Sequence, residues 1–422
     1  MELYTAFSLL LVVAAAFAYL NFRFLHLPST IGLMVLALLS SLALVGLGRM
    51  GVPAVLEIAN VVRTIDFHTV LMQVMLSFML FAGGLHLDAA SLGRQRLPVL
   101  TLSTVGTMLS TVLVATSLYI TLPLFGLPLA FVYCLLFGAL ISPTDPIAVL
   151  GILTKAGIQK PLEIKIVGES LFNDGVGVVI FATVLSVAKA GAEALSVGAV
   201  LGLFLREALG GVALGLALGY GGSFLLRSID NYKVEVLLTL ALVAGGSSLA
   251  TLLHTSGPLA MVMAGIIIGH LGRRDMSDVT QEYVDKFWEM LDEILNALLF
   301  VLMGLQMLVL NITPLYLLVG LLAVGLVLFA RLISVGLPLA VLSLRQQFTD
   351  NSLTILTWGG LRGGISVALA LSLPPTMPRD LLVGVTYVVV VFSILVQGLT
   401  IGPLAQYLQT KQQKRAQATK PQ

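Results

Sequence analysis

Long apolar runs, repeated along almost the whole chain, limit this sequence to one kind of fold. A helix that crosses a lipid bilayer needs about 20 mostly apolar residues, and thirteen segments of the sequence meet or approach that length. Only 10% of the 422 residues are charged, whereas a soluble protein carries about 25%. The sequence therefore predicts an all-α polytopic membrane protein and excludes a water-soluble enzyme. The predicted spans are residues 3–20, 30–48, 69–87, 97–120, 127–150, 163–187, 195–226, 234–253, 257–271, 294–310, 314–343, 351–373 and 381–408.

The positions of Lys and Arg between these spans predict an orientation. Cytoplasmic loops of membrane proteins are enriched in both residues. With thirteen spans and a cytoplasmic C-terminus, sixteen of the 23 Lys and Arg fall on the cytoplasmic side and four outside. The pattern predicts an N-terminus outside and a C-terminal tail, 409–422, in the cytoplasm. The connection Gly272–Glu293 is predicted to be an amphipathic helix on the cytoplasmic surface.

The fifth predicted span contains a motif that must interrupt its helix. Pro143 and Pro146 lie three residues apart in Ser142-Pro143-Thr144-Asp145-Pro146. Each proline lacks an amide donor and disfavours helical geometry at the residue before it. A simple proline kink would explain the prolines alone, but it needs no carboxylate. Asp145 in the break therefore favours an ion pathway, where charged groups within spans are usually found.

The sixth predicted span carries a compact set of hard oxygen ligands. Glu169 and Asn173 are four residues apart and share one helical stripe, while Ser170 and Asp174 share the next stripe. Carboxylate, amide and hydroxyl oxygens suit Na⁺ or Li⁺ rather than soft metals. A cytoplasmic helix cap is the plain alternative, but the span continues for many residues beyond Asp174. We therefore expect these groups to lie within the membrane.

The twelfth predicted span contains a second interruption. Trp358-Gly359-Gly360-Leu361-Arg362-Gly363-Gly364 surrounds one arginine with four glycines, which predicts an unwound helix. This span crosses the membrane in the opposite direction to the fifth. Paired interrupted spans in two halves are typical of inverted-repeat transporters with a site at the midplane. Arg331, in the eleventh span, is either a further core charge or a side chain that extends to the interface.

Several other classes of function are excluded or lack support. The formal net charge of +2 gives no reason to expect a nucleic-acid partner, and the single cysteine excludes a cysteine-based metal cluster. No phosphate-binding loop or HExxH motif is present. We therefore expect neither enzymatic activity nor a cofactor other than the transported ions.

Three motifs together resemble those of one transporter family. Ser142-Pro143-Thr144-Asp145-Pro146, Gly168-Glu169-Ser170-Leu171-Phe172-Asn173-Asp174-Gly175 and Gly360-Leu361-Arg362-Gly363 resemble the NhaP-like sodium/proton antiporters of the monovalent cation:proton antiporter superfamily. The Asn-Asp pair separates this branch from relatives with Asp-Asp. The resemblance covers essentially the whole chain. It implies a homodimer in a prokaryotic plasma membrane, two crossing broken helices, and a role in pH homeostasis.

The resemblance also implies residue roles. Asp174 would carry either the proton or the cation, Na⁺ or Li⁺, with Ser170 and Thr144 as further Na⁺ ligands. Glu169 would form an ion pair with Arg331, and Arg362 is the alternative partner of Glu169. Arg362 would also hold the crossing of the two broken helices. The candidate ion-binding residues are Asp174, Asn173, Ser170, Thr144 and Asp145. Some relatives add an acidic residue near Phe81-Ala82-Gly83-Gly84-Leu85, where this chain has alanine.

The same resemblance predicts how one transmembrane domain divides and what it exchanges. The predicted parts are a domain of 1–408, with a dimerisation part of about 1–96 and 195–310 and an ion-transporting core of about 97–190 and 314–408. The predicted core has a formal charge of −1, because it contains three acids (Asp145, Glu169 and Asp174) and two arginines (Arg331 and Arg362). One H⁺ or one Na⁺ balances that charge, which predicts electroneutral exchange by alternating access. A K⁺/H⁺ antiporter and a cation channel remain the alternatives.

Overall fold

The computed structural model describes residues 2–50, 72, 75–191, 196–273, 276–308, 313–344, 348 and 351–418. Over these residues every regular element is a helix and no strand occurs, which confirms the all-α prediction. The beginnings of the predicted spans 69–87 and 195–226, the end of span 294–310 and the last four tail residues lie outside this part of the chain.

Most helices are long and apolar, and several contain a π-helical or 3₁₀ turn. The elements before the first helix break are α1 (Glu2–Leu20), η1 (Asn21–Leu25), α2 (Ser29–Arg49), α5 (Leu76–His86), α6 (Ala89–Arg94), α7 (Arg96–Thr101), η3 (Leu102–Gly106), α8 (Thr107–Thr121), η4 (Leu122–Phe125) and α9 (Phe131–Ile141). Those that follow are α10 (Ile147–Lys155), α11 (Lys160–Ala190), α12 (Val197–Leu226), α13 (Tyr232–Leu252), α14 (Gly257–Ile267), η5 (Ile268–Gly272), α16 (Asp278–Gln306), α17 (Pro314–Ser343), α18 (Ser352–Trp358), α19 (Gly364–Leu371), α20 (Arg379–Phe392), η6 (Ser393–Gln397) and α21 (Gly398–Ala418).

The helix lengths support a polytopic membrane protein. Within the described ranges, eight helices are long and apolar enough to cross a membrane, and three shorter apolar helices accompany them. The two remaining predicted spans are the interrupted segment 351–373 and α16, whose first half is charged. The number thirteen stays a prediction, because interrupted and half-polar segments do not meet a criterion of length and hydropathy.

The amphipathic helix predicted within Gly272–Glu293 is present from Asp278 onward, but the predicted boundary between it and the tenth span is wrong. Helix α16 runs without interruption from Asp278 to Gln306 and so joins the amphipathic segment to the apolar one. The Ser277 side chain accepts a hydrogen bond from the Thr280 amide and caps its start. No glycine or proline occurs between Asp278 and Met303, so nothing in the sequence breaks the helix at the expected boundary.

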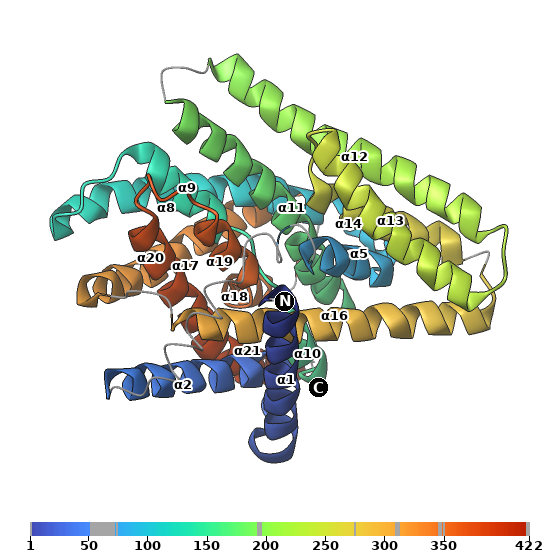
Figure 1. The fold of residues 1–422 in the computed structure, drawn as a ribbon, viewed down its shortest axis with the longest axis horizontal. Coiled ribbons are helices and arrows are strands. Elements are labelled where there is room, and N and C mark those ends of the chain that lie inside the picture. The colour runs from blue at the N-terminus through green and yellow to red at the C-terminus, as the bar shows by residue number, and fades with distance from the viewer. Residues whose placement is uncertain are drawn as a thin grey trace.

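Helix α11 lies between two groups of helices (Figure 1). On one side, α5, α12 and α13 pack around α14; on the other, α8 packs with α9 and α17, and α20 packs with α17 and α19. Helix α16 runs across the molecule and contacts α1, α2, α5, α13 and α19. Close approach of α5 and α14 requires Gly84 and Gly265, because a Cβ on either would overlap the backbone of the other helix.

Candidate functional site

Two interrupted helices cross at the centre of the site. The chain leaves helical geometry between α9 and α10 at Ser142–Pro146 and between α18 and α19 at Gly359–Gly363. The Asp145 amide donates a hydrogen bond of 2.8 Å to the Leu361 carbonyl, which joins the two breaks directly. A Cβ at Gly363 would overlap the Asp145 carboxylate, so glycine is needed for this close approach. Both sequence-predicted interruptions are therefore present, and they lie against each other.

Arg362 holds the crossing through backbone carbonyls. Its Nη1 donates to the carbonyl oxygens of Ser142 and Pro143, the latter at 3.0 Å. The side chain is 2% exposed. Carbonyls freed by a helix break inside a membrane need a new donor, because no bulk water reaches them. Arg362 supplies that donor and joins the second break to the first.

A π-helical turn supports the same crossing from a third helix. Ser393 Oγ accepts a hydrogen bond of 2.9 Å from the Arg362 amide and donates one of 2.7 Å to Gln397 Oε1. Gln397 Nε2 in turn donates to the Trp358 carbonyl at 2.9 Å. Both residues belong to η6, and their role was missed in the sequence because a π-helical turn leaves no recognisable pattern there.

Arg331 and Glu169 form a buried ion pair. Arg331 Nη1 contacts Glu169 Oε1, and the two side chains are 6% and 1% exposed. Nη2 of Arg331 also donates to the Leu356 carbonyl at 3.1 Å, near the end of α18. These contacts exclude the alternative in which Arg331 extends to the membrane interface. They join α11, α17 and the second interrupted helix.

Asn173 and Ser170 lie behind the first break and bind Thr144. Asn173 Oδ1 accepts from the Thr144 amide at 3.1 Å, and its Nδ2 donates to Thr144 Oγ1 at 2.8 Å. Ser170 Oγ is 2.9 Å from the same hydroxyl. Both polar ends of Asn173 therefore hold the unwound chain against α11.

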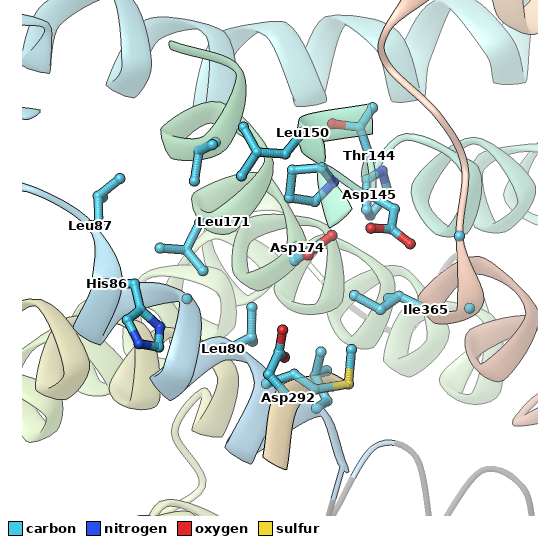
Figure 2. Close-up of a pocket in the computed structure, with 18 of the residues that line it drawn as sticks. Leu80, His86, Leu87, Thr144, Asp145, Leu150, Leu171, Asp174, Asp292 and Ile365 are labelled. Atoms are coloured by element: carbon cyan, nitrogen blue, oxygen red, sulfur yellow. The ribbon is translucent and has the colours of Figure 1, made fainter. Parts of the chain in front are cut away.

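Asp174 borders a cavity of about 300 Å³ that begins at the crossing. Its side chain is 6% exposed. Figure 2 shows Asp174 and Asp145 on one side of this cavity with Thr144 above them. Asp174 and Asp145 carry like charges and line the same cavity. Two carboxylates at the wall of one cavity are stabilised when a positive charge reduces their combined negative charge.

The structure separates the five candidate ion-binding residues into two sets. Asp174, Asp145 and Thr144 line the cavity, whereas Ser170 and Asn173 do not. Ser170 and Asn173 both hydrogen-bond to the cavity residue Thr144. The spacing predicted that Ser170 and Asn173 lie on adjacent helical stripes, but it could not show that the unwound chain at Thr144 covers them.

Asp292 is a cavity residue that the sequence reasoning did not identify. It lies on α16 and lines the same cavity as Asp174. The assignment of Gly272–Glu293 to a surface helix placed it outside the membrane. A helix without breaks from Asp278 onward was the available signal.

Comparison with known proteins agrees with this geometry. A family model described as "Sodium/hydrogen exchanger, transmembrane" matches residues 11–407. The Na⁺/H⁺ antiporter NhaP of Pseudomonas aeruginosa is 53% identical over 392 residues, covering 92% of each chain. The Na⁺/H⁺ antiporter NhaH of Halobacillus dabanensis is 37% identical and covers 81% of this chain and 84% of its own.

The fold is similar to that of a solved antiporter. The structure of the sodium proton antiporter MjNhaP1 from Methanocaldococcus jannaschii at pH 8 covers 96% of this chain and 99% of its own. Its TM-score is 0.74 at 21% sequence identity. The predicted antiporter fold is thereby confirmed. From the matched family model and these relatives, the chain belongs to the transmembrane sodium/hydrogen exchanger family.

Proposed function

We propose that this chain exchanges Na⁺ for H⁺ across the membrane and that Asp174 binds either ion. The observation that carries the proposal is the buried Asp174 carboxylate at the wall of a cavity, beside two crossing broken helices. The antiport named for the relatives from Pseudomonas and Halobacillus supports the choice of ions.

The site explains how the two ions compete. A carboxylate in a confined, partly apolar cavity is stabilised when a proton or a cation balances its charge. Thr144 and Asp145 line the same cavity and supply further oxygen ligands. Oxygen ligands of this kind suit Na⁺ and Li⁺. Because one carboxylate binds only one ion at a time, arrival of Na⁺ releases H⁺, and the opposing gradient drives transport without ATP.

Helix packing supports a division into a stationary part and a moving core. Helices α8, α9, α17, α19 and α20 pack with one another, while α5, α12, α13 and α14 pack on the other side of α11. We assign the first group to the ion-transporting core, about 97–190 and 314–408, and the second to the dimerisation part, about 1–96 and 195–310. Rocking of the core would expose Asp174 to either side of the bilayer in turn.

The proposed assembly is a homodimer with N-termini outside and C-terminal tails in the cytoplasm. Helix α12 supports the dimer proposal, because only 11% of its most apolar window is buried within one chain. Such a face is suited to lipid or to a second copy.

Proton flux in proteoliposomes tests the function. The purified protein is reconstituted into vesicles with an acidic interior that contain a pH-sensitive dye. Addition of Na⁺ or Li⁺ outside should dissipate the pH gradient. A response to K⁺ with none to Na⁺ would identify a K⁺/H⁺ exchanger. Sodium flux that leaves the pH gradient unchanged would identify a cation channel. If none of Na⁺, Li⁺ and K⁺ changes the pH gradient, cation/proton antiport is rejected.

Replacement of Ser170 by alanine is expected to weaken sodium binding without stopping turnover. Its hydroxyl lies 2.9 Å from Thr144 Oγ1 and orients that cavity side chain. Loss of one such hydrogen bond costs about 1 kcal/mol, so the Na⁺ concentration for half-maximal proton flux should rise several-fold. Ser186→Ala, an exposed position on the same helix, is the matched control. An unchanged sodium dependence in Ser170→Ala would mean that Ser170 only packs.

We expect exchange to be electroneutral, with one Na⁺ for one H⁺. Arg331 and Arg362 both reach the crossing, where Asp145, Glu169 and Asp174 leave a formal charge of −1. Either ion on Asp174 brings that charge to zero, and an uncompensated charge in the membrane is costly. Membrane potentials set with K⁺ and valinomycin should leave initial rates and the final sodium gradient unchanged. A sodium gradient that shifts with voltage would contradict one-for-one exchange.

A further inference from the structure

Asp292 presents a carboxylate to the transport cavity from a helix that the proposed core does not include. Figure 2 shows its carboxylate directed toward the space that Asp174 and Ile365 also border. Among the described residues, the Asn296 side chain lies in hydrogen-bonding range of this carboxylate, but Oδ1 itself has no hydrogen-bond partner of good geometry. Asn296, one turn later, donates its side-chain amide to the Asp292 backbone carbonyl. A buried carboxylate oxygen without a donor is suited to a cation that arrives from outside the protein.

Ser366, another residue of the cavity lining, carries a second unsatisfied oxygen. It lies in the first turn of α19, directly after the second break, and is 1% exposed. Its Oγ has no hydrogen-bond partner within the described part of the chain. Buried hydroxyls are normally hydrogen-bonded, so an unpartnered one that lines a cavity indicates a ligand site. The hydroxyl is neutral, which makes this observation independent of the acidic residues.

The charges around the cavity favour a cation rather than an anion. Lys160 is the only lysine or arginine among the described lining residues, whereas Asp145, Asp174 and Asp292 all contribute to the wall. Asp145 and Asp292 reach this cavity from two different helical segments. Arg331 binds Glu169 and a backbone carbonyl instead. A monovalent cation between these carboxylates would reduce their mutual repulsion.

We propose that Asp292 and Ser366 form a second cation site, where Na⁺ is held before it reaches Asp174. The inference rests on the function proposed above. Helix α16, which carries Asp292, packs mainly on α2, α13 and α1, outside the proposed core, and makes fewer contacts with α19 of the core. Asp174 and Ser366 belong to the core and Asp292 to the stationary part. The cation is therefore transferred from the stationary part to the core, and the Asp292 charge does not cross the membrane with the cargo.

The test compares Asp292→Asn with its neighbour Glu293→Gln in proteoliposomes. Glu293 is exposed, so its replacement removes the same charge one residue away without changing the cavity. For Asp292→Asn we expect an increase of about tenfold in the Na⁺ concentration for half-maximal proton flux, because a contact to an ion is worth more than 1 kcal/mol. The maximal rate should stay close to that of the unmodified protein. Asp292→Glu should restore most of the sodium affinity.

The outcomes separate this inference from the proposed function. Suppose that the unmodified protein exchanges Na⁺ for H⁺ and that Asp292→Asn needs the same Na⁺ concentration for half-maximal proton flux. The second cation site is then wrong, while the proposed antiport stands. The second site is also wrong if Asp292→Asn lowers only the maximal rate, or if Glu293→Gln raises the half-maximal Na⁺ concentration as much as Asp292→Asn does. If Asp292→Asn does not fold, Ser366→Ala takes its place, with a several-fold increase in half-maximal Na⁺ expected and an unchanged value contradicting the site. Absence of exchange in the unmodified protein rejects the function itself.

Discussion

Replacement of Asp174 by asparagine is expected to abolish sodium-driven proton exchange while leaving the protein folded. The asparagine amide has nearly the same shape as the carboxylate, but it neither takes up a proton nor balances the charge of Na⁺. The carboxylate is 6% exposed, and the repulsion from Asp145 is removed with its charge. Thermal unfolding in detergent should therefore occur at the same or a higher temperature. Proton flux should fall to the level of empty vesicles.

The control for this prediction is another aspartate-to-asparagine change away from the cavity. Asp380, exposed in the first turn of α20, carries the same charge outside the site. Asp380→Asn should retain full exchange. Sodium-driven proton flux in Asp174→Asn at the normal rate would remove Asp174 from the centre of the mechanism, and Asp145 or Asp292 would become the candidate carrier.

Removal of either partner of the Glu169–Arg331 pair is expected to destabilise the protein strongly. Both side chains are at least nine-tenths buried, so the remaining partner would be left as an unpaired charge in the interior. Such losses cost about 3–5 kcal/mol in soluble proteins. Glu169→Gln and Arg331→Met should each lower the thermal unfolding temperature sharply. The double variant should recover part of the loss, because it leaves no buried charge behind.

A double-mutant cycle measured by thermal unfolding tests the pairing. Arg331 also donates to the Leu356 carbonyl, so recovery should be partial rather than complete. The exposed pair Lys286–Glu282, separated by 2.5 Å, is the control, and Glu282→Gln should change stability little. Strictly additive losses in the two single variants would mean that Glu169 and Arg331 do not interact, and would favour Arg362 as the partner of Glu169.

The helix breaks could be predicted because their causes are local. Pro143 and Pro146 remove amide donors whatever the surroundings, and the glycines around Arg362 weaken a helix in any environment. Opposite crossing directions then followed from the span order. That the two breaks touch, through the Asp145 amide and the Leu361 carbonyl, depends on how distant segments pack.

The donors that satisfy the broken backbone could be predicted only in part. An arginine within each of two spans indicated buried charges, and the resemblance suggested their roles. The hydrogen bonds from Arg362 to the Ser142 and Pro143 carbonyls, and from Gln397 to the Trp358 carbonyl, require side chains to reach backbone more than thirty residues away. No local pattern encodes such distances.

The sequence by itself determined the class of this protein and its two interrupted spans, and it predicted Asp174 as the carboxylate of the proposed ion site. These follow from hydropathy, proline and glycine chemistry and the scarcity of charges in apolar runs, all of which act within about twenty residues. Only the tertiary structure decided which oxygens line the cavity. It placed Asn173 and Ser170 behind Thr144, and it brought Asp292 from α16 to the cavity wall. The physical reason is that a cavity forms between packed helices, so its lining depends on contacts between segments far apart in the chain.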